Sequence, residues 1–192
     1  GTYLTMQWVK GGTLAEIIAA RGALPPREVA DLAAKLASAL AAAHERKILH
    51  RDIKPGNILI DETGEPYLAD FGLARLIGGR GLTRHGVFVG TPHYCSPEQV
   101  KLEELDERSD IYALGLVIFE MTTGRRPFEA ETVAEVLDMQ RNTPAPDPLA
   151  IAPGIPGELA AITLRCLAKD PADRISNAAE LADALRRVAD SL

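Results

Sequence analysis

The chain has 192 residues, of which 46% are hydrophobic and 25% are charged, a balance typical of one globular domain. Asp and Glu outnumber Lys and Arg by 27 to 21, and the net charge of −6 argues against a nucleic-acid binder, which is usually basic. The longest apolar stretch, residues 114–119, is too short to cross a bilayer, so no membrane segment is expected in this chain. The two cysteines lack CxxC spacing, which favours a reducing, cytoplasmic setting over a disulfide framework or a zinc site.

The first quarter of the chain predicts one strand and two helices. Residues 2–9 have strand composition from the outset, without a cap or leader, so we expect the chain to be cut at its N-terminus. Residues 10–12 predict a turn, and Thr13 is suited to capping a helix over 14–20. A Pro pair then opens a long helix that ends near Glu45. Its apolar residues recur every three or four positions, which indicates one buried face: Val29, Leu32, Leu36, Leu40 and Ala43.

The helical period disappears between residues 47 and 69. Two short strand-like runs, 58–60 and 67–69, flank a segment with the composition of a hairpin turn. Residues 72–97 then form a long stretch rich in Gly, Arg and Thr. A loop of that length inside a compact domain is usually functional or mobile.

Helices resume in the second half of the chain. Residues 109–123 are apolar almost all round, which predicts a buried core helix that ends at Gly124. Further helices are expected over 132–140, 157–168 and 177–188, with a Pro-rich connector over 144–156. The fold class is therefore α+β, mainly α: one helical lobe with short β-pairs.

Two short motifs follow the long helix. His50-Arg51-Asp52-Ile53-Lys54-Pro55-Gly56-Asn57 comes first, and Asp70-Phe71-Gly72 begins 18 positions after Asp52. Together they resemble the catalytic loop and the metal-binding loop of protein kinases. Either motif alone is also compatible with an ordinary turn, so their order along the chain is what points to this family.

The resemblance continues in order through the rest of the chain. Gly90-Thr91-Pro92-His93-Tyr94-Cys95-Ser96-Pro97-Glu98 is similar to the substrate-binding segment that ends in Ala-Pro-Glu, with Ser96 in place of Ala. Asp110 resembles the start of the central buried helix, and Asp170-Pro171-Ala172-Asp173-Arg174 resembles a late motif with a structural Arg. The match covers essentially residues 1–192 and is closest in style to bacterial Ser/Thr kinases.

The resemblance assigns roles in catalysis. Phosphoryl transfer needs positioning and charge neutralisation more than covalent help from the protein. Asp52 is expected to orient or accept the proton of the attacking hydroxyl, and Lys54 to neutralise charge on the phosphoryl group. Asn57 and Asp70 are expected to share Mg²⁺, a hard cation that prefers oxygen ligands. Lys54 and Thr91 together indicate Ser/Thr rather than Tyr as the acceptor.

Other residues have structural or regulatory roles by the same resemblance. His50 is expected to pack near Phe71 in the core, Asp110 to accept backbone N–H groups of the catalytic loop, and Glu98 to form a buried ion pair with Arg174. Arg51 is expected to bind a phosphate on the activation loop, for which Thr83 is the best acceptor. An ordinary loop Thr is the alternative for Thr83. Thr91 is expected at the substrate site, in contact with Asp52.

The opening strand resembles the hinge that holds the adenine of ATP. Met6 would lie at the back of the nucleotide pocket, and Leu59 would form its floor. The carbonyl of Gln7 and the N–H of Val9 would face the adenine edge. Plain core packing is the alternative for Met6 and Leu59, and it is left open here.

The chain lacks a Gly-rich phosphate loop, a strand Lys and its partner Glu, which precede the hinge in this family. We therefore expect residues 1–192 to be the hinge and large lobe of a kinase domain, with the small lobe absent and the fragment inactive. Its expected partners are its own N-terminal lobe and protein substrates with Ser or Thr. A half-kinase or pseudokinase that docks a partner without catalysis is the alternative, and an unrelated helical scaffold would require the order of motifs to be accidental.

Overall fold

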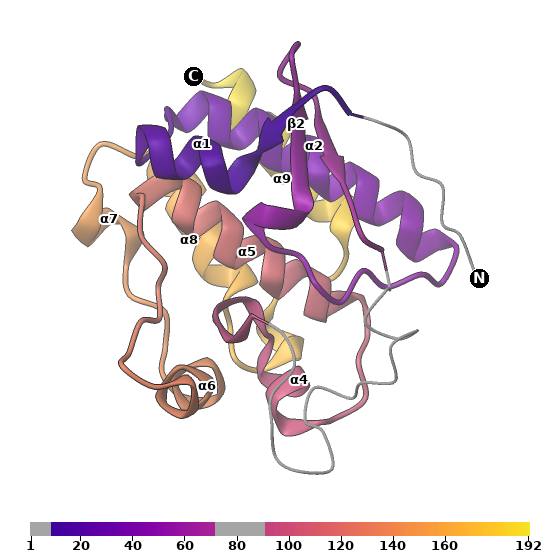
Figure 1. Cartoon of the computed structure of the whole chain (residues 1–192), viewed down its shortest axis with the longest axis vertical. Coiled ribbons are helices and arrows are strands. Elements are labelled where there is room, and N and C mark those ends of the chain that lie inside the picture. Colours follow the sequence, from indigo (N-terminus) through magenta and orange to yellow (C-terminus); the bar gives the residue numbers. More distant parts are fainter. Residues whose placement is uncertain (1–8, 72–90) are drawn as a thin grey trace.

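The computed structural model describes residues 9–71 and 91–192, and most of these residues are helical (Figure 1). Three short strands form one antiparallel sheet with β2 in the middle: β1 (Gly11–Thr13), β2 (Ile58–Asp61) and β3 (Pro66–Leu68). The helices are α1 (Leu14–Arg21), α2 (Pro26–Glu45), α4 (Pro97–Lys101), α5 (Glu107–Thr123), α6 (Val133–Asn142), α7 (Pro148–Ile151), α8 (Gly157–Cys166) and α9 (Ala178–Asp190). Three 3₁₀ turns are η1 (Pro55–Asn57), η2 (Pro92–Tyr94) and η3 (Pro171–Asp173). The predicted α+β, mainly α class is confirmed.

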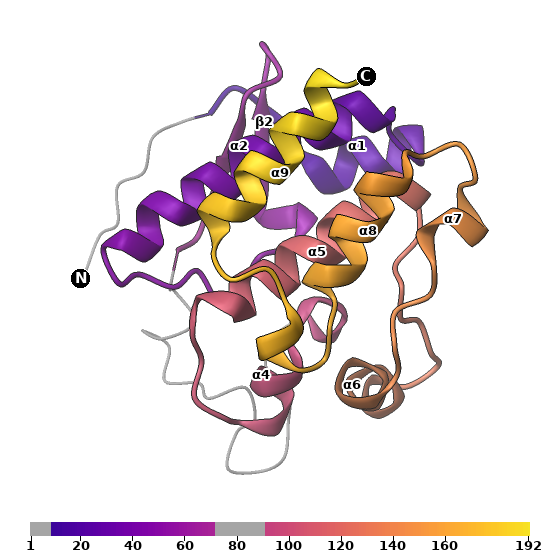
Figure 2. The ribbon, with the colours of Figure 1, turned by 180° about the vertical axis from the view of Figure 1, so that it is seen from behind.

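Helix α5 runs through the middle of the lobe, with α2 and α8 packed against it (Figures 1 and 2). Its apolar residues face neighbours on every side, and Ile111, Leu114 and Ile118 are all 0% exposed. The predicted core helix is therefore confirmed. It begins at Glu107, two residues earlier than expected, because the Asp106 side chain accepts the N–H of Arg108 and caps the helix.

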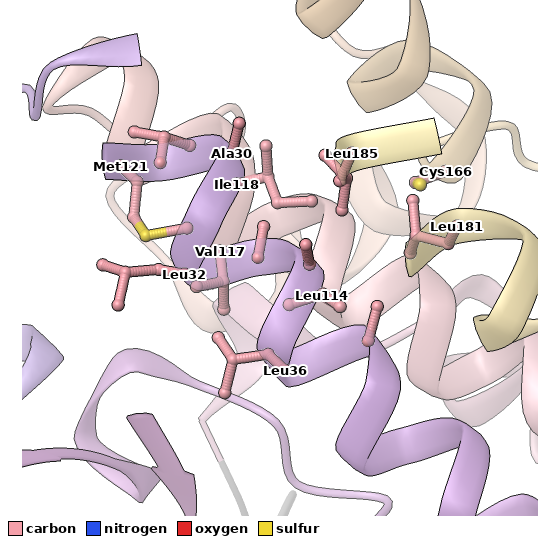
Figure 3. Close-up of a cluster of buried hydrophobic side chains, with 14 of the residues drawn as sticks. Ala30, Leu32, Leu36, Leu114, Val117, Ile118, Met121, Cys166, Leu181 and Leu185 are labelled. Atoms are coloured by element: carbon pink, nitrogen blue, oxygen red, sulfur yellow. The ribbon is translucent and has the colours of Figure 1, made fainter. Parts of the chain in front are cut away.

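The long helix α2 buries one face, as its sequence period predicts. That face packs on α5 and on α9, which runs alongside α2 on the back of the lobe (Figure 2). Figure 3 shows the shared core, where side chains from α2, α5 and α9 meet beside Cys166 of α8. Each fully buried Leu or Ile there stabilises the fold by about 1.5–3 kcal/mol relative to an exposed side chain.

The prediction of a turn over residues 10–12 was wrong. Gly11 and Gly12 pair with Asp61 and Ile60 as part of β1, so the short β-pairs share β2 in a single sheet. A Cβ added to Gly11 would lie 1.9 Å from the carbonyl oxygen of Ile60. Glycine is therefore needed at this position for the close approach of the two strands rather than for a turn.

Two short helices escaped the sequence analysis. Helix α4 begins at the last residue of the expected loop over residues 72–97, and α7 lies within the Pro-rich connector. Both begin with Pro after a side-chain cap, since Ser96 accepts the N–H of Gln99 and Asp147 accepts that of Leu149. Helices of four or five residues have too few turns for a hydrophobic period, so only their caps could have indicated them.

Helices α5 and α8 approach each other closely at Gly115. A Cβ built on Gly115 would lie 2.6 Å from the Cβ of Cys166, a distance that real side chains do not tolerate. The two helices therefore depend on glycine at this point in order to pack together.

We expect Gly115→Ala to lower the free energy of unfolding by about 1–3 kcal/mol, because the two helices must move apart. In an unobstructed helix interior the same change would instead stabilise by about 1 kcal/mol. Gly157→Ala, in the first turn of α8 with nothing within 4 Å, is the matched control and should be neutral or stabilising. Urea unfolding measures both variants. A Gly115→Ala protein as stable as the parent chain would contradict this packing argument.

Candidate active site

The catalytic loop is attached to the core by one buried carboxylate, Asp110. This residue lies in the first turn of α5 and is 1% exposed. Its Oδ2 accepts the backbone N–H of His50 at 2.8 Å, and its Oδ1 accepts that of Arg51 at 2.8 Å. The Nε2 of buried His44 lies 2.9 Å from the same Oδ2. These contacts hold Arg51 at a φ of 71°, a left-handed conformation that a non-glycine residue adopts only when its surroundings impose it.

Two predicted catalytic residues, Lys54 and Asn57, donate hydrogen bonds to a third, Asp52. The Lys54 Nζ donates to Asp52 Oδ2 at 2.8 Å. The Asn57 Nδ2 donates to the same Oδ2 at 2.9 Å and to the Asp52 carbonyl at 2.8 Å. The 3₁₀ turn η1 makes this possible, because it folds the chain back within five residues. Among the described residues, both side-chain hydrogen bonds to Asp52 use Oδ2, and none uses Oδ1.

The residues around Asp70 lie against this loop. The backbone carbonyl of Asn57 accepts the N–H of Ala69 at 2.8 Å, and the carbonyl of Ala69 lies 3.0 Å from His50 Nε2. Asp70 itself has a φ of 62°, a second left-handed non-glycine residue in the site. The segment that carries Asp70 is thereby fixed beside Asn57.

His50 and Phe71 pack together, with ring centroids 4.5 Å apart. Burial lowers the pKa of His50, so its ring is neutral at neutral pH and packs rather than carries charge. Phe71, in contrast, is 38% exposed. Phe71 therefore contacts His50 as expected, but it is not buried in the core.

The oxygen donors of Asn57 and Asp70 fit a magnesium ion. The Asn57 amide nitrogen is committed to Asp52, so its Oδ1 is the atom available to a cation. Within residues 9–71 and 91–192, no group of three or more His, Cys, Asp and Glu could hold a metal ion by itself. An amide oxygen and one carboxylate suit an ion that completes its shell with water and phosphate oxygens, as Mg²⁺ does.

A groove of about 750 Å³ opens beside Lys54. Its walls come from α1, η1, η2 and the end of α5, and they include Gly56, Thr91, Tyr94 and Glu120. Thr91 thus lines the same groove as Lys54. Thr91 was expected to contact Asp52, but no hydrogen bond joins these two residues, both of which the structure describes. The Thr91 carbonyl instead accepts the N–H of Tyr94 at 3.2 Å.

Glu98 and Arg174 form a bidentate ion pair in the interior. The Arg174 Nη1 and Nη2 lie 2.7 and 2.8 Å from Glu98 Oε1 and Oε2, and both residues are under 5% exposed. Ser109 Oγ also donates to Glu98 Oε1 at 2.6 Å. Burial alone would raise the pKa of Glu98, but the hydrogen bonds from Arg174 and Ser109 outweigh it and the pKa lies below its usual value. The pair ties the end of the predicted substrate segment to the loop after α8.

The predicted nucleotide and regulatory residues are only partly visible. Met6, Gln7 and Thr83 lie outside the described residues. Val9 is half-buried, and half-buried Leu59 pairs with Thr13 across the sheet. The backbone carbonyl of Arg51 accepts a hydrogen bond from Gln99 Nε2 at 2.8 Å, which links the catalytic loop to α4.

The sequence analysis missed several polar contacts of buried and half-buried residues around the site. His44 contacts Asp110, Gln99 contacts the catalytic loop, and the Tyr94 hydroxyl donates to Glu120 in the groove. Each pair joins residues that are distant in sequence. The sequence does contain one indication of these contacts. His44 lies on the apolar face of α2, and this position predicts a buried side chain.

Comparison with known proteins follows this geometry. The model of the protein kinase domain family matches residues 1–185. The chain belongs to the protein kinase family. It is 36% identical over 190 residues to serine/threonine-protein kinase PknL of Mycobacterium tuberculosis, a match that covers 99% of this chain and 48% of that protein.

Two further bacterial relatives of the same kind match most of the chain. Serine/threonine-protein kinase PrkC of Bacillus subtilis is 39% identical over 179 residues, which cover 93% of this chain and 28% of PrkC. Serine/threonine-protein kinase PknB of Mycobacterium tuberculosis is 38% identical over 189 residues, which cover 97% of this chain and 30% of PknB. The predicted resemblance to bacterial Ser/Thr kinases is confirmed. The chain spans about half the length of PknL and less than a third of the other two.

Within residues 9–71 and 91–192, every helix is too short or too polar to span a bilayer.

We expect Asp110→Asn to lower the free energy of unfolding by about 1–3 kcal/mol, because an amide offers one acceptor oxygen where two backbone N–H groups need one each. Denaturant unfolding of the 192-residue chain measures the change. Asp31→Asn, at an exposed position on α2, is the control and should stay within about 0.5 kcal/mol of the parent. Equal stability of the two variants would mean that the loop does not depend on Asp110.

We expect Glu98→Gln to lower the free energy of unfolding by about 3–5 kcal/mol at neutral pH, because it leaves the Arg174 guanidinium buried without a counter-charge. The lowered pKa of Glu98 adds stability above about pH 4.5, its unfolded value, and this stability is lost as the pH falls through the folded value. The stability difference between parent and variant should therefore shrink on acidification. Glu104→Gln, at an exposed position, is the control. A difference that does not change with pH would contradict the assignment.

Proposed function

We propose that this chain is the hinge and C-terminal lobe of a Ser/Thr protein kinase, which transfers the γ-phosphate of ATP to Ser or Thr hydroxyls of proteins. Family membership and the three relatives support the class of reaction. The observation that carries the proposal is the constellation of Asp52, Lys54 and Asn57, fixed to the core through Asp110.

The geometry suggests how these residues act. Asp52 Oδ1 faces the attacking hydroxyl, orients it and takes its proton as the new O–P bond forms and the bond to the leaving ADP oxygen breaks. Lys54, held at Asp52 Oδ2, adds positive charge beside the transferred phosphoryl group. Because Lys54 and Asn57 together fix the carboxylate, Asp52 needs little reorientation during the reaction.

ATP would bind between this lobe and a small lobe, with the adenine edge against the hinge carbonyl of Gln7 and N–H of Val9, and with Met6 and Leu59 on either side. Asn57 and Asp70 would hold Mg²⁺, which when bound neutralises the phosphate oxygens. The Gly-rich loop and strand Lys that complete a kinase are absent from these 192 residues. We therefore propose that this segment alone has no useful turnover and that its small lobe is its first partner.

The groove beside Lys54 would receive the protein substrate, with Thr91 on its wall near the acceptor hydroxyl. Activation would depend on a phosphate at Thr83 that pairs with Arg51. This fits Arg51, whose guanidinium makes no hydrogen bond within residues 9–71 and 91–192 while its backbone is held by Asp110 and Gln99. Both cysteines are free thiols, which agrees with a reducing, cytoplasmic setting.

The test uses the longest native polypeptide that contains this sequence, with Mg-ATP and a generic Ser/Thr protein substrate. We expect the parent to incorporate phosphate and Asp52→Asn to lower kcat by about 10²–10⁴-fold, the usual contribution of a general base. Asp31→Asn should retain full activity. The 192-residue chain alone should show none.

Equal phosphate incorporation by the parent and by Asp52→Asn would refute the role of Asp52. A parent that folds and binds protein partners but transfers no phosphate would instead favour the alternative, a half-kinase or pseudokinase that acts as a binding module.

A further inference from the structure

Lys169, in the loop between α8 and η3, reaches across to two other helices. Its Nζ donates to the Tyr112 hydroxyl of α5 at 2.9 Å, and to the carbonyls of Gln140 and Met139 of α6 at 2.8 and 3.1 Å. Three acceptors match the three N–H groups of an ammonium. The carbonyls belong to the last turn of α6, where a cation is also favoured by the helix dipole.

Two aromatic rings complete the surroundings of this ammonium. The Lys169 Nζ lies 4.1 Å from the ring centroid of Phe128 and 5.3 Å from that of Tyr112, both in range of a cation–π interaction. Phe128 is 1% exposed and Tyr112 is 0% exposed. An ordinary surface lysine has no such set of partners. The ammonium of Lys169 is held in one place by three hydrogen-bond acceptors and two aromatic rings.

The contacts continue from Lys169 to the predicted substrate segment. The Tyr112 hydroxyl donates to Gln140 Oε1 at 2.7 Å, and Gln140 Nε2 donates to the backbone carbonyl of His93 in η2 at 2.7 Å. Gln140 and Tyr112 are both 0% exposed, so the hydrogen bond between them is shielded from water and costly to break. Lys169, Tyr112 and Gln140 thus form one relay, buried at its centre, that ends on the half-buried His93.

The same loop holds the segment at a second point. Arg174 pairs with Glu98, and its Nη2 also donates to the carbonyl of Lys169 at 3.1 Å. Residues 169–174 therefore contact both ends of residues 93–98: at His93 through the relay, and at Glu98 through the ion pair. Tyr94, which lies between these two points, lines the groove beside Lys54.

We propose that Lys169 is a positioning residue, whose ammonium fixes the substrate segment on α6 through Tyr112 and Gln140. This inference rests on the proposed function, because it takes residues 91–98 as the substrate segment. Lys169 does not touch the reacting atoms. It acts on the backbone that forms the wall of the groove.

The protonation state of Lys169 decides the conditions of the test. Burial lowers its pKa to about 7, and the nearby Arg174 guanidinium acts in the same direction. Burial raises the pKa of Tyr112, so that hydroxyl keeps its proton and donates to Gln140. At pH 6 Lys169 therefore has all three N–H donors, and the measurements are made there.

The first experiment is amide hydrogen exchange on the 192-residue chain. We expect Lys169→Met to speed exchange about tenfold or more at Tyr94, Cys95 and Thr143, since their hydrogen bonds lie in η2 and at the end of α6. Amides inside α9 should be unchanged. Lys169→Arg keeps the cation and should restore most of the protection.

Gln140→Met is a second variant in case Lys169→Met does not fold. It removes the bond to His93 while Lys169 keeps its two carbonyl acceptors. We therefore expect faster exchange at Tyr94 and Cys95 but not at Thr143. Unchanged exchange at Tyr94 and Cys95 in both variants, or acceleration everywhere including α9, would overturn the proposal.

The second experiment is steady-state kinetics in the longest native polypeptide. Lys169→Met should raise the KM for a protein substrate about tenfold, leave the KM for ATP unchanged and be rescued by Lys169→Arg. Equal effects on both substrates would contradict a positioning role. If the parent has no kinase activity, the proposed function fails, but the exchange experiment still decides whether Lys169 controls residues 93–95.

Discussion

The buried carboxylate of Asp110 is the interaction on which the candidate site depends. It lies at the N-terminal end of the most buried helix, where two backbone N–H groups of the catalytic loop and one imidazole converge on its two oxygens. An ionised carboxylate in the interior is stable only when it is fully hydrogen-bonded. The carboxylate therefore needs the loop as much as the loop needs the carboxylate. Asp52 lies two residues beyond His50, so these hydrogen bonds also fix its position relative to α5. The loop itself has no regular secondary structure.

The polar contacts around the site fall into two groups, according to how far apart their partners lie in the sequence. The small sheet and η1 place Asn57 beside Asp52, and the N–H of Ala69 donates to the Asn57 carbonyl, so these groups are positioned by nearby segments. The predicted substrate segment is instead held over long sequence distances. Glu98 pairs with Arg174 in the interior, and His93 is linked to Lys169 through Gln140 by partly buried hydrogen bonds. Residues between α8 and α9 are thus connected to both ends of that segment.

Sequence analysis succeeded for the long helices. The period of α2 identified its buried face, and the apolar composition of α5 on all sides identified a core helix. It failed where a contact decided the structure. The glycine pair before Thr13 has the composition of a turn, yet strand pairing with Asp61 and Ile60 makes it part of a sheet. Phe71 is a large apolar residue of the kind expected in a core, yet it is partly exposed and its ring contacts His50.

By itself the sequence determined the fold class and the family and gave the candidate catalytic side chains, because these follow from residue types at short spacings and in a fixed order. Only the tertiary structure decided which oxygen of Asp52 accepts the hydrogen bonds of Lys54 and Asn57, that His44 contacts Asp110, and that a lysine after α8 is linked through Gln140 to the backbone of His93. The physical reason is the range of the interactions. Hydrophobic periodicity and helix capping act within a few residues. Buried hydrogen bonds instead join any two groups that packing brings together, so no pattern along the sequence predicts these bonds.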